Sequence, residues 1–258
     1  MNIQQYYQQS AAVSLNAGLA AFIPSIVILI YVFFISHFYQ LIILVSPFLI
    51  YSFFCYQKYL LNQKRAKAVK WSSTSLESSD QNLFAGKLLF AFLPAPSLRL
   101  LLFTPNGKKA GEIRDQSFSW IKWFTPNFLD RLFVNKYILI DDSDQPIAFF
   151  RDLKDRIEII SPANEKVVVF KLNGGKKKEY CLENKRITIK NSSLQDYYFL
   201  LPDETILAEI QTGWMPIEWG DRFVDSNTPI LTMKGDWSER EIVQLFSLLV
   251  CLYKFRNH

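Results

Sequence analysis

The first 57 residues contain no Asp, Glu, Lys or Arg, and this lack of charge constrains the fold more than any other feature. Residues 15–35 form an apolar run that is long enough to cross a bilayer as a helix, for which about 20 residues suffice. A second apolar run, residues 41–56, follows after a very short connection. Helices that are joined so closely must run antiparallel. We therefore expect residues 1–61 to form a two-helix transmembrane hairpin.

This stretch has three other interpretations besides two membrane spans. A cleaved signal peptide needs a positively charged start, which is missing here, and a second apolar run would not follow it at once. A buried hairpin of a soluble protein would carry some charge over so many residues. A re-entrant hairpin that enters a single leaflet remains an alternative, because the second run is short for a full span.

A basic segment without acidic residues follows the second apolar run, and it consists of Lys58, Lys64, Arg65, Lys67 and Lys70. Because Lys and Arg beside a span hold that end in the cytoplasm, we expect a multi-pass protein of the cell membrane with both termini cytoplasmic. The other 24 basic residues of the chain equal its 24 acidic residues in number. The remainder is thus neutral, and we expect no nucleic-acid partner. The three cysteines form no CxxC pair, so we expect buried thiols in a reducing compartment.

Residues 62–85 are basic and then rich in serine, and they are expected to form a linker. From residue 86 onward, short apolar runs alternate with turn sequences. Four pairs of runs stand out: 98–103 with 111–113, 137–140 with 147–150, 157–160 with 167–172, and 197–201 with 206–210. Each pair flanks a turn that is rich in Pro, Asn, Asp or Gly, which predicts consecutive antiparallel hairpins.

The end of the chain has a different pattern, which predicts a helix over residues 238–256. Ser238 and Glu241 have the spacing of a capping box. Residues 242–253 are apolar at every position except Gln244 and Ser247, so the helix must be enclosed on all sides. At about 18 Å it is short for a membrane span. We therefore expect β-strands to wrap a central helix.

Two tryptophans precede this helix, in the segment TGWMPIEWG. Trp214 and Trp219 are each flanked by a glycine, Gly213 and Gly220, which could bend the chain. Because large aromatic side chains dominate protein cores, we expect both tryptophans to fill the barrel.

The serial hairpins YILIDDSDQPIAFF and RIEIISPANEKVVVF and the ending GDWSEREIVQLFSLLVCLYKFR resemble the tubby-like superfamily, which includes tubby C-terminal domains, plant LURP-one-related proteins and phospholipid scramblases. The resemblance covers about residues 85–258. It implies a closed antiparallel barrel of about twelve strands around a hydrophobic C-terminal helix. The fold expected for the whole chain is therefore a membrane-anchored α+β protein, with the transmembrane hairpin placed before the barrel over residues 86–258.

The candidate site residues are basic side chains that could hold anionic lipid headgroups: Lys58, Lys64, Arg65, Lys67, Lys70, Lys176, Lys177 and Lys178. For the first five, a role in topology alone is the alternative. For the last three, the alternative is a solvated hairpin tip. The chain has no GxGxxG, GxxxxGK[ST], GxSxG or HExxH motif, and only two histidines. We expect no enzyme activity, catalytic residue, metal site or cofactor.

Three functions are compatible with these features. The first is a non-enzymatic, membrane-anchored protein that binds or senses anionic lipid, or docks a partner, at the cytoplasmic face. The second is an accessory or immunity-type subunit whose spans pack against an integral-membrane partner. The third is scramblase-like lipid transport, although residues 221–227, which correspond to the calcium loop of scramblases, lack a full set of oxygen ligands.

Overall fold

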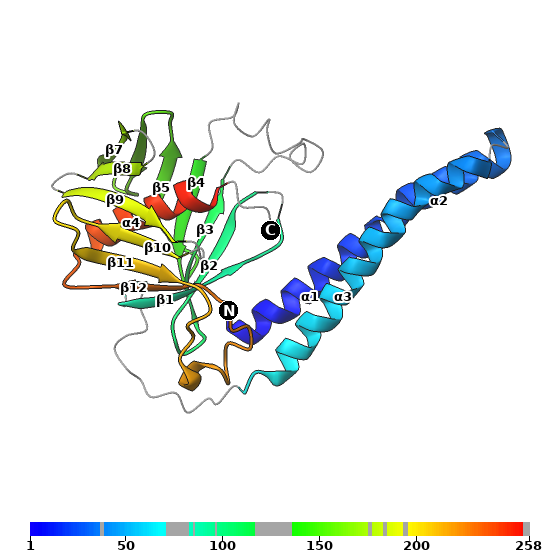
Figure 1. Ribbon diagram of the computed structural model, residues 1–258, viewed down its shortest axis with the longest axis horizontal. Helices are drawn as coiled ribbons and strands as arrows, with labels where there is room; N and C mark the ends of the chain where they lie inside the picture. Colours follow the sequence, from blue (N-terminus) through cyan, green and yellow to red (C-terminus); the bar gives the residue numbers. More distant parts are fainter. Residues whose placement is uncertain are drawn as a thin grey trace. The chain divides into compact units, whose positions relative to one another are not determined.

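The computed structural model describes residues 1–36, 39–70, 83–84, 86–95, 97–116, 136–174, 177–182, 185–192 and 196–254. The chain forms two compact units (Figure 1). One comprises Ile3–Trp71, and the other comprises Met1–Asn2 together with Ser72–His258.

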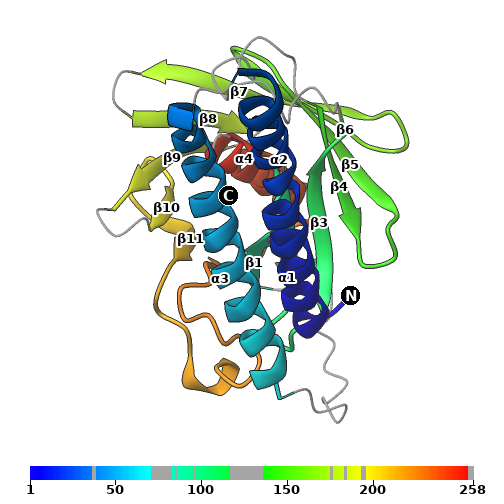
Figure 2. The same ribbon diagram turned by 90° about the vertical axis from the view of Figure 1, so that its right-hand side faces the viewer.

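The first unit is a helical hairpin. Its elements are α1 (Ile3–Ala20), α2 (Phe22–Tyr31), the π-helical turn η1 (Val32–Ser36), the 3-10 segment η2 (Tyr39–Val45) and α3 (Ser46–Ala68). Figure 2 shows that α1 and α3 run side by side along their length. His37, in the predicted connection, lies outside the described residues.

The two prolines of the hairpin affect its helices differently. Pro24 lacks the N–H that would bond the carbonyl four residues earlier, and the regular helix is interrupted just before it, at Ala21. The Ser25 hydroxyl donates a hydrogen bond to the Ala21 carbonyl at 3.2 Å. Pro47 lies in the first turn of α3, where no intrahelical N–H bond is needed. Pro24 therefore accompanies the break between α1 and α2, whereas Pro47 leaves α3 undisturbed.

Helix α3 continues to Ala68, seven residues beyond the expected end of the hairpin at residue 61. Residues 62–68 (NQKRAKA) are almost all good helix formers and contain neither Pro nor Gly. Arg65 and Lys67 lie in the last turn, where positive charge complements the helix dipole. The first part of the predicted linker is thus helical.

The second unit is a closed barrel of twelve antiparallel strands. The strands are β1 (Lys87–Phe92), β2 (Arg99–Phe103), β3 (Lys109–Asp115), β4 (Lys136–Asp141), β5 (Pro146–Asp152), β6 (Arg156–Ile160), β7 (Lys166–Gly174), β8 (Lys177–Leu182), β9 (Lys185–Asn191), β10 (Tyr197–Leu200), β11 (Ile206–Gln211) and β12 (Ile230–Met233). Each strand pairs with its neighbours in the sequence, and β12 pairs with β1 to close the barrel. Closure leaves no strand edge unpaired.

The four predicted hairpins are β2–β3, β4–β5, β6–β7 and β10–β11. Each of their turns contains one residue with positive φ: Gly107, Asp144, Asn164 and Glu204. In each turn, this residue donates its N–H to the carbonyl three positions earlier, as Gly107 does to Thr104 at 2.8 Å. Three of the hairpins also show a register shift beside the turn. A turn that ends in a left-handed residue and a bulge is a common hairpin connection, which explains why local sequence predicted these pairs.

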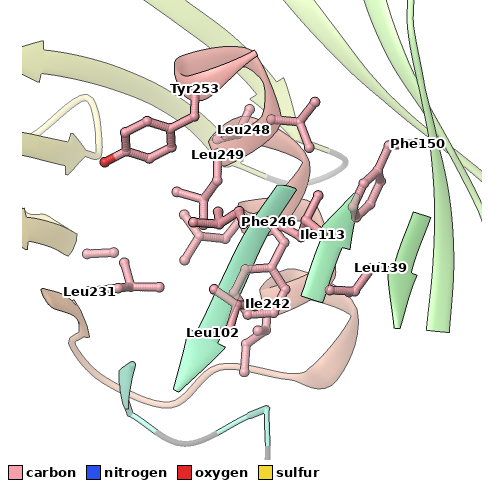
Figure 3. Packing of buried hydrophobic residues seen from close by; sticks show 14 of the residues in the cluster. Leu102, Ile113, Leu139, Phe150, Leu231, Ile242, Phe246, Leu248, Leu249 and Tyr253 are labelled. Atoms are coloured by element: carbon pink, nitrogen blue, oxygen red, sulfur yellow. The ribbon is translucent and has the colours of Figure 1, made fainter. Parts of the chain in front are cut away.

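The C-terminal helix α4 (Glu239–Tyr253) lies inside the barrel (Figure 1). Ser238 is its N-cap, and both hydrogen bonds of the predicted capping box with Glu241 are present. Figure 3 shows side chains of α4 that point toward strand residues on several sides, including Leu102, Ile113 and Phe150. The expected fold, a helical hairpin followed by a twelve-stranded barrel around a hydrophobic helix, is confirmed.

The expectation that Trp214 and Trp219 fill the barrel is wrong. Trp214 is 69% exposed, and it lies in the connection between β11 and β12. Trp219 lies in the 3-10 turn η5 (Ile217–Trp219), where the Lys87 ammonium lies 5.8 Å from its ring centroid. Because α4 already fills the lumen, these rings have no space inside. Gly213 does bend the chain with φ of +85°, whereas Gly220 has an ordinary φ.

Shortening one side chain of α4 tests its central position. Leu249 is fully buried in the barrel core, so Leu249→Ala should lower the free energy of unfolding by about 2–5 kcal/mol. As a control, Ile217→Ala, at a residue that is 97% exposed, should change it by less than about 0.5 kcal/mol. Five of the six tryptophans belong to the barrel unit, so denaturant unfolding followed by tryptophan fluorescence reports mainly on the barrel. Equal stability of both variants would contradict the central placement of α4.

Candidate functional site

The two long helices of the hairpin turn small side chains toward each other. A Cβ placed on Gly18 of α1 would lie 3.2 Å from the Cβ of Cys55 in α3, and 3.5 Å from the Ser52 carbonyl oxygen. Ser14 is also buried, and its hydroxyl bonds the Ser10 carbonyl at 2.9 Å within α1. Such close contact through small residues is typical of helix pairs in membranes.

The outward surface of the hairpin is formed by large apolar side chains. The exposed ones include Phe22, Ile23, Ile26, Val27, Ile30, Phe33, Phe34, Ile43, Leu44, Leu49, Ile50, Phe53 and Phe54. A soluble hairpin would bury such residues and expose polar ones. Both helical arms, Ile3–Phe34 and Ile42–Ala68, are long and apolar enough to cross a membrane.

The structure also bears on the short second apolar run. Segment η2 is a 3-10 helix of seven residues, which rises about 2.0 Å per residue and so adds about 14 Å. Residues 46–56 of α3 add about 16 Å at the α-helical rise. Together they reach about 30 Å, which matches the hydrocarbon thickness of a bilayer.

The end of the hairpin opposite its connection is polar and basic. The Gln4 side chain of α1 donates a hydrogen bond to the Ala66 carbonyl of α3 at 3.2 Å, so the start of one helix and the end of the other meet there. Four of the predicted basic residues, Lys58, Lys64, Arg65 and Lys67, lie along the last three turns of α3, and Lys70 follows the helix. All of these are exposed except Arg65, which is half-buried. We call this region the basic end.

Tyrosines lie beside the basic end. The rings of Tyr56 and Tyr59 are 6.0 Å apart in α3, and Gln63 donates a hydrogen bond to the Tyr59 hydroxyl at 2.7 Å. The ring centroids of Tyr6 and Tyr7, near the start of α1, are 5.3 Å apart, and the rings are tilted relative to each other. Along α3, the hairpin thus passes from apolar to aromatic to basic residues. This order is characteristic of a membrane–water interface.

The second predicted basic cluster belongs to the barrel unit. Lys178 is exposed in β8, where it pairs with Ile189 of β9. The backbone of Lys177 pairs with Gly174 at the end of β7. Lys176 lies outside the described residues. Helix α3 therefore brings four of the predicted residues together, while Lys177 and Lys178 lie at the end of a barrel hairpin.

Inside the barrel, α4 is held by ion pairs at both of its ends, which sequence reasoning missed. At its start, the Glu241 carboxylate accepts hydrogen bonds from the Lys185 ammonium of β9, and from the Ser238 N–H and hydroxyl at 3.0 and 2.9 Å. These bonds, the one from Lys185 first, lower the pKa of Glu241 to about 2 from its ordinary 4.5.

At the other end, the Asp152 carboxylate of β5 accepts hydrogen bonds from the ammonium groups of Lys171 in β7 and Lys254 at the helix C-cap. The Cys251 thiol lies 3.7 Å from the same carboxylate. Burial and the nearby Asp152 raise the pKa of Cys251 to about 12, so this thiol stays protonated and unreactive. The three cysteines are free; Cys55 is buried as expected, whereas Cys181 and Cys251 are half-buried.

No family model matches this chain, and no curated protein matches its sequence. Among solved structures, an X-ray structure of a protein from Arabidopsis thaliana matches with 14% sequence identity and a TM-score of 0.39. The match covers 64% of this chain and 90% of that one. The description of the fold therefore depends on the strand order and helix position of the present chain.

The low pKa of Glu241 predicts a pH dependence of stability. Because the carboxyl is more acidic in the folded than in the unfolded chain, its contribution is complete above about pH 5 and is lost as the pH falls from about 4.5 toward 2. At pH 7, Glu241→Gln should lower the free energy of unfolding by about 1–2 kcal/mol, because a charged acceptor is replaced by a neutral one.

The difference between wild type and Glu241→Gln should shrink when unfolding is measured at pH 3. Glu165→Gln, at an exposed turn residue, serves as the matched control and should differ little from wild type at either pH. A constant difference between pH 7 and pH 3 would show that the Glu241 carboxylate does not provide this stabilisation.

Proposed function

We propose that this protein is an integral membrane protein whose two spans anchor a cytoplasmic β-barrel. The observation that carries the proposal is the distribution of side chains in the hairpin, which is the reverse of that in a water-soluble protein. Small residues such as Gly18 and Cys55 lie between the helices, while large apolar side chains cover the outside. That surface is stable only in an apolar solvent.

The basic end supports an orientation. Lys58, Lys64, Arg65 and Lys67 follow the second span directly, and the first span has no charged residue on either side. Positive charge next to a span favours the cytoplasmic side. Both termini, and with them the barrel, are then cytoplasmic, and only the connection between the spans is outside.

We further propose that the basic end binds anionic lipid headgroups. The exposed ammonium groups of Lys58, Lys64 and Lys67 extend from a helix that leaves the membrane beside interfacial tyrosines. Each such charge near an anionic leaflet contributes about 1 kcal/mol. In this proposal the barrel is a non-enzymatic module that is held at an anionic membrane surface, where it senses lipid or docks a partner.

Cysteine labelling tests the orientation. In a variant whose three cysteines are replaced by serine, His37→Cys should react with a membrane-impermeant maleimide added to intact cells. Lys67→Cys should react only after the membrane is opened. The two single-cysteine proteins differ only in the position of the thiol, so each is the control of the other. Labelling of position 67 from outside intact cells would refute the orientation.

Native mass spectrometry of the full chain tests the lipid. After purification in detergent, the wild type should retain phosphatidylglycerol in preference to phosphatidylcholine. In Lys58→Gln/Lys64→Gln/Lys67→Gln, each lost charge should weaken this retention about fivefold.

The matched control is Lys136→Gln/Lys154→Gln/Lys190→Gln, which removes the same charge from exposed positions of the barrel. This control should retain phosphatidylglycerol as the wild type does. Equal loss in both triple variants would mean that net charge, and not the basic end, determines the preference.

A further inference from the structure

A pocket of about 330 Å³ opens at the start of α4, within the barrel unit. We call it the mouth pocket. Its lining residues come from β8, from β9 and from the start of α4, including the N-cap and the residue before it. They are Leu182, Lys185, Ile187, Trp237, Ser238, Arg240, Glu241 and Gln244. The volume is at the lower end of the range for small-molecule sites. The pocket therefore suits a small organic molecule and is too small for a whole phospholipid.

One part of the lining is apolar and rigid. Leu182 and Ile187 are buried and belong to the barrel core. Trp237 is held in place because its indole N–H donates a hydrogen bond to the Lys234 carbonyl at 3.0 Å. A flat apolar group is the chemistry that such walls accommodate.

A polar side chain of α4 also lines the pocket. Gln244 is only 3% exposed, and it belongs to the pocket lining. Ser247, the other polar residue in the apolar part of α4, donates its hydroxyl to the Gln244 carbonyl at 2.7 Å. The Gln244 amide offers a ligand in the pocket both a donor and an acceptor.

The entrance of the pocket carries cationic donors. Lys185 pairs with Glu241 and lies 5.8 Å from the Trp237 ring centroid. An ammonium has three N–H donors, so this one has further donors beyond the pair with Glu241. Arg240 also lines the pocket. The Glu241 carboxylate already accepts three hydrogen bonds from its neighbours. The two cationic side chains beside it favour an anion as the ligand.

We propose that the mouth pocket binds a small organic anion, a carboxylate or phosphate on a flat apolar body. The anionic group bonds Lys185 and Arg240, the body packs against Leu182, Ile187 and Trp237, and a polar atom of the ligand bonds the Gln244 amide. The proposal does not depend on the membrane hairpin or on the headgroup site, because every residue involved belongs to the barrel.

Isothermal titration calorimetry of the full chain in detergent micelles tests the proposal. The probes are 2-naphthoate, 2-naphthyl phosphate and the uncharged methyl 2-naphthoate. At least one of the two anions should bind at submillimolar concentration, and the better one identifies the preferred anionic group. The ester should bind at least about tenfold more weakly, because it lacks the charge-assisted hydrogen bonds.

Two variants, each with a control, locate the site. Lys185→Gln should weaken binding of the anion about tenfold, while Lys190→Gln, which removes an exposed ion pair from the same strand, should not. Gln244→Leu should weaken binding about fivefold, while the exposed Gln145→Leu should not. The ligand-free Gln244→Leu protein should melt close to the wild type, because leucine has a similar volume and suits the apolar surroundings of the barrel core. That result separates loss of binding from loss of fold.

Three outcomes would overturn the proposal. If neither anion binds at up to millimolar concentration, the pocket holds water only. If the ester binds as tightly as the anions, the cationic entrance has no role. If Gln244→Leu and Lys185→Gln bind as the wild type does, the anion partitions into the micelle or binds elsewhere on the chain.

Discussion

Enclosure of the C-terminal helix is the constraint on which the barrel depends. Helix α4 is apolar nearly all round, so no single sheet or helix face could cover it. Twelve strands that close on themselves supply apolar side chains on every side and leave no unpaired edge. Ion pairs at Glu241 and Asp152 then hold the two ends of the helix. The helix and the barrel thus share one hydrophobic core.

In the proposed function, the two units obey the same physical rule in different solvents. In the barrel, large apolar side chains such as Phe246 are buried, and charges such as Lys190 are exposed. In the hairpin the order is reversed, with Gly18 between the helices and Phe54 on the outside. Water requires the first arrangement and lipid permits the second. In the proposed function, the basic end lies at the boundary between lipid and water.

Local patterns predicted the elements whose formation depends on nearby residues. The four hairpins with Gly107, Asp144, Asn164 or Glu204 in their turns were found, because turn chemistry is encoded within a few positions. Strands β1, β8, β9 and β12 were not delimited. Strands β1 and β12 pair with each other from opposite ends of the barrel sequence, and at least half of the residues of β8 and β9 are polar. Trp214 was misplaced because its size suggested a core position, while α4 left no room for it. The basic run of α3 was predicted, but its helical state was not.

The sequence alone determined that the first 57 residues carry no charged side chain, that the basic segment follows them, and that a capped apolar helix needs an enclosure. These properties follow from composition and spacing, which every copy of the chain carries before it folds. Only the tertiary structure decided how strand β12 meets β1, which carboxylates hold the ends of α4, and that Gln244 lies beside Lys185 at one pocket. Such contacts join residues far apart in the chain, and their partners are selected by the closure of the barrel and not by local preference.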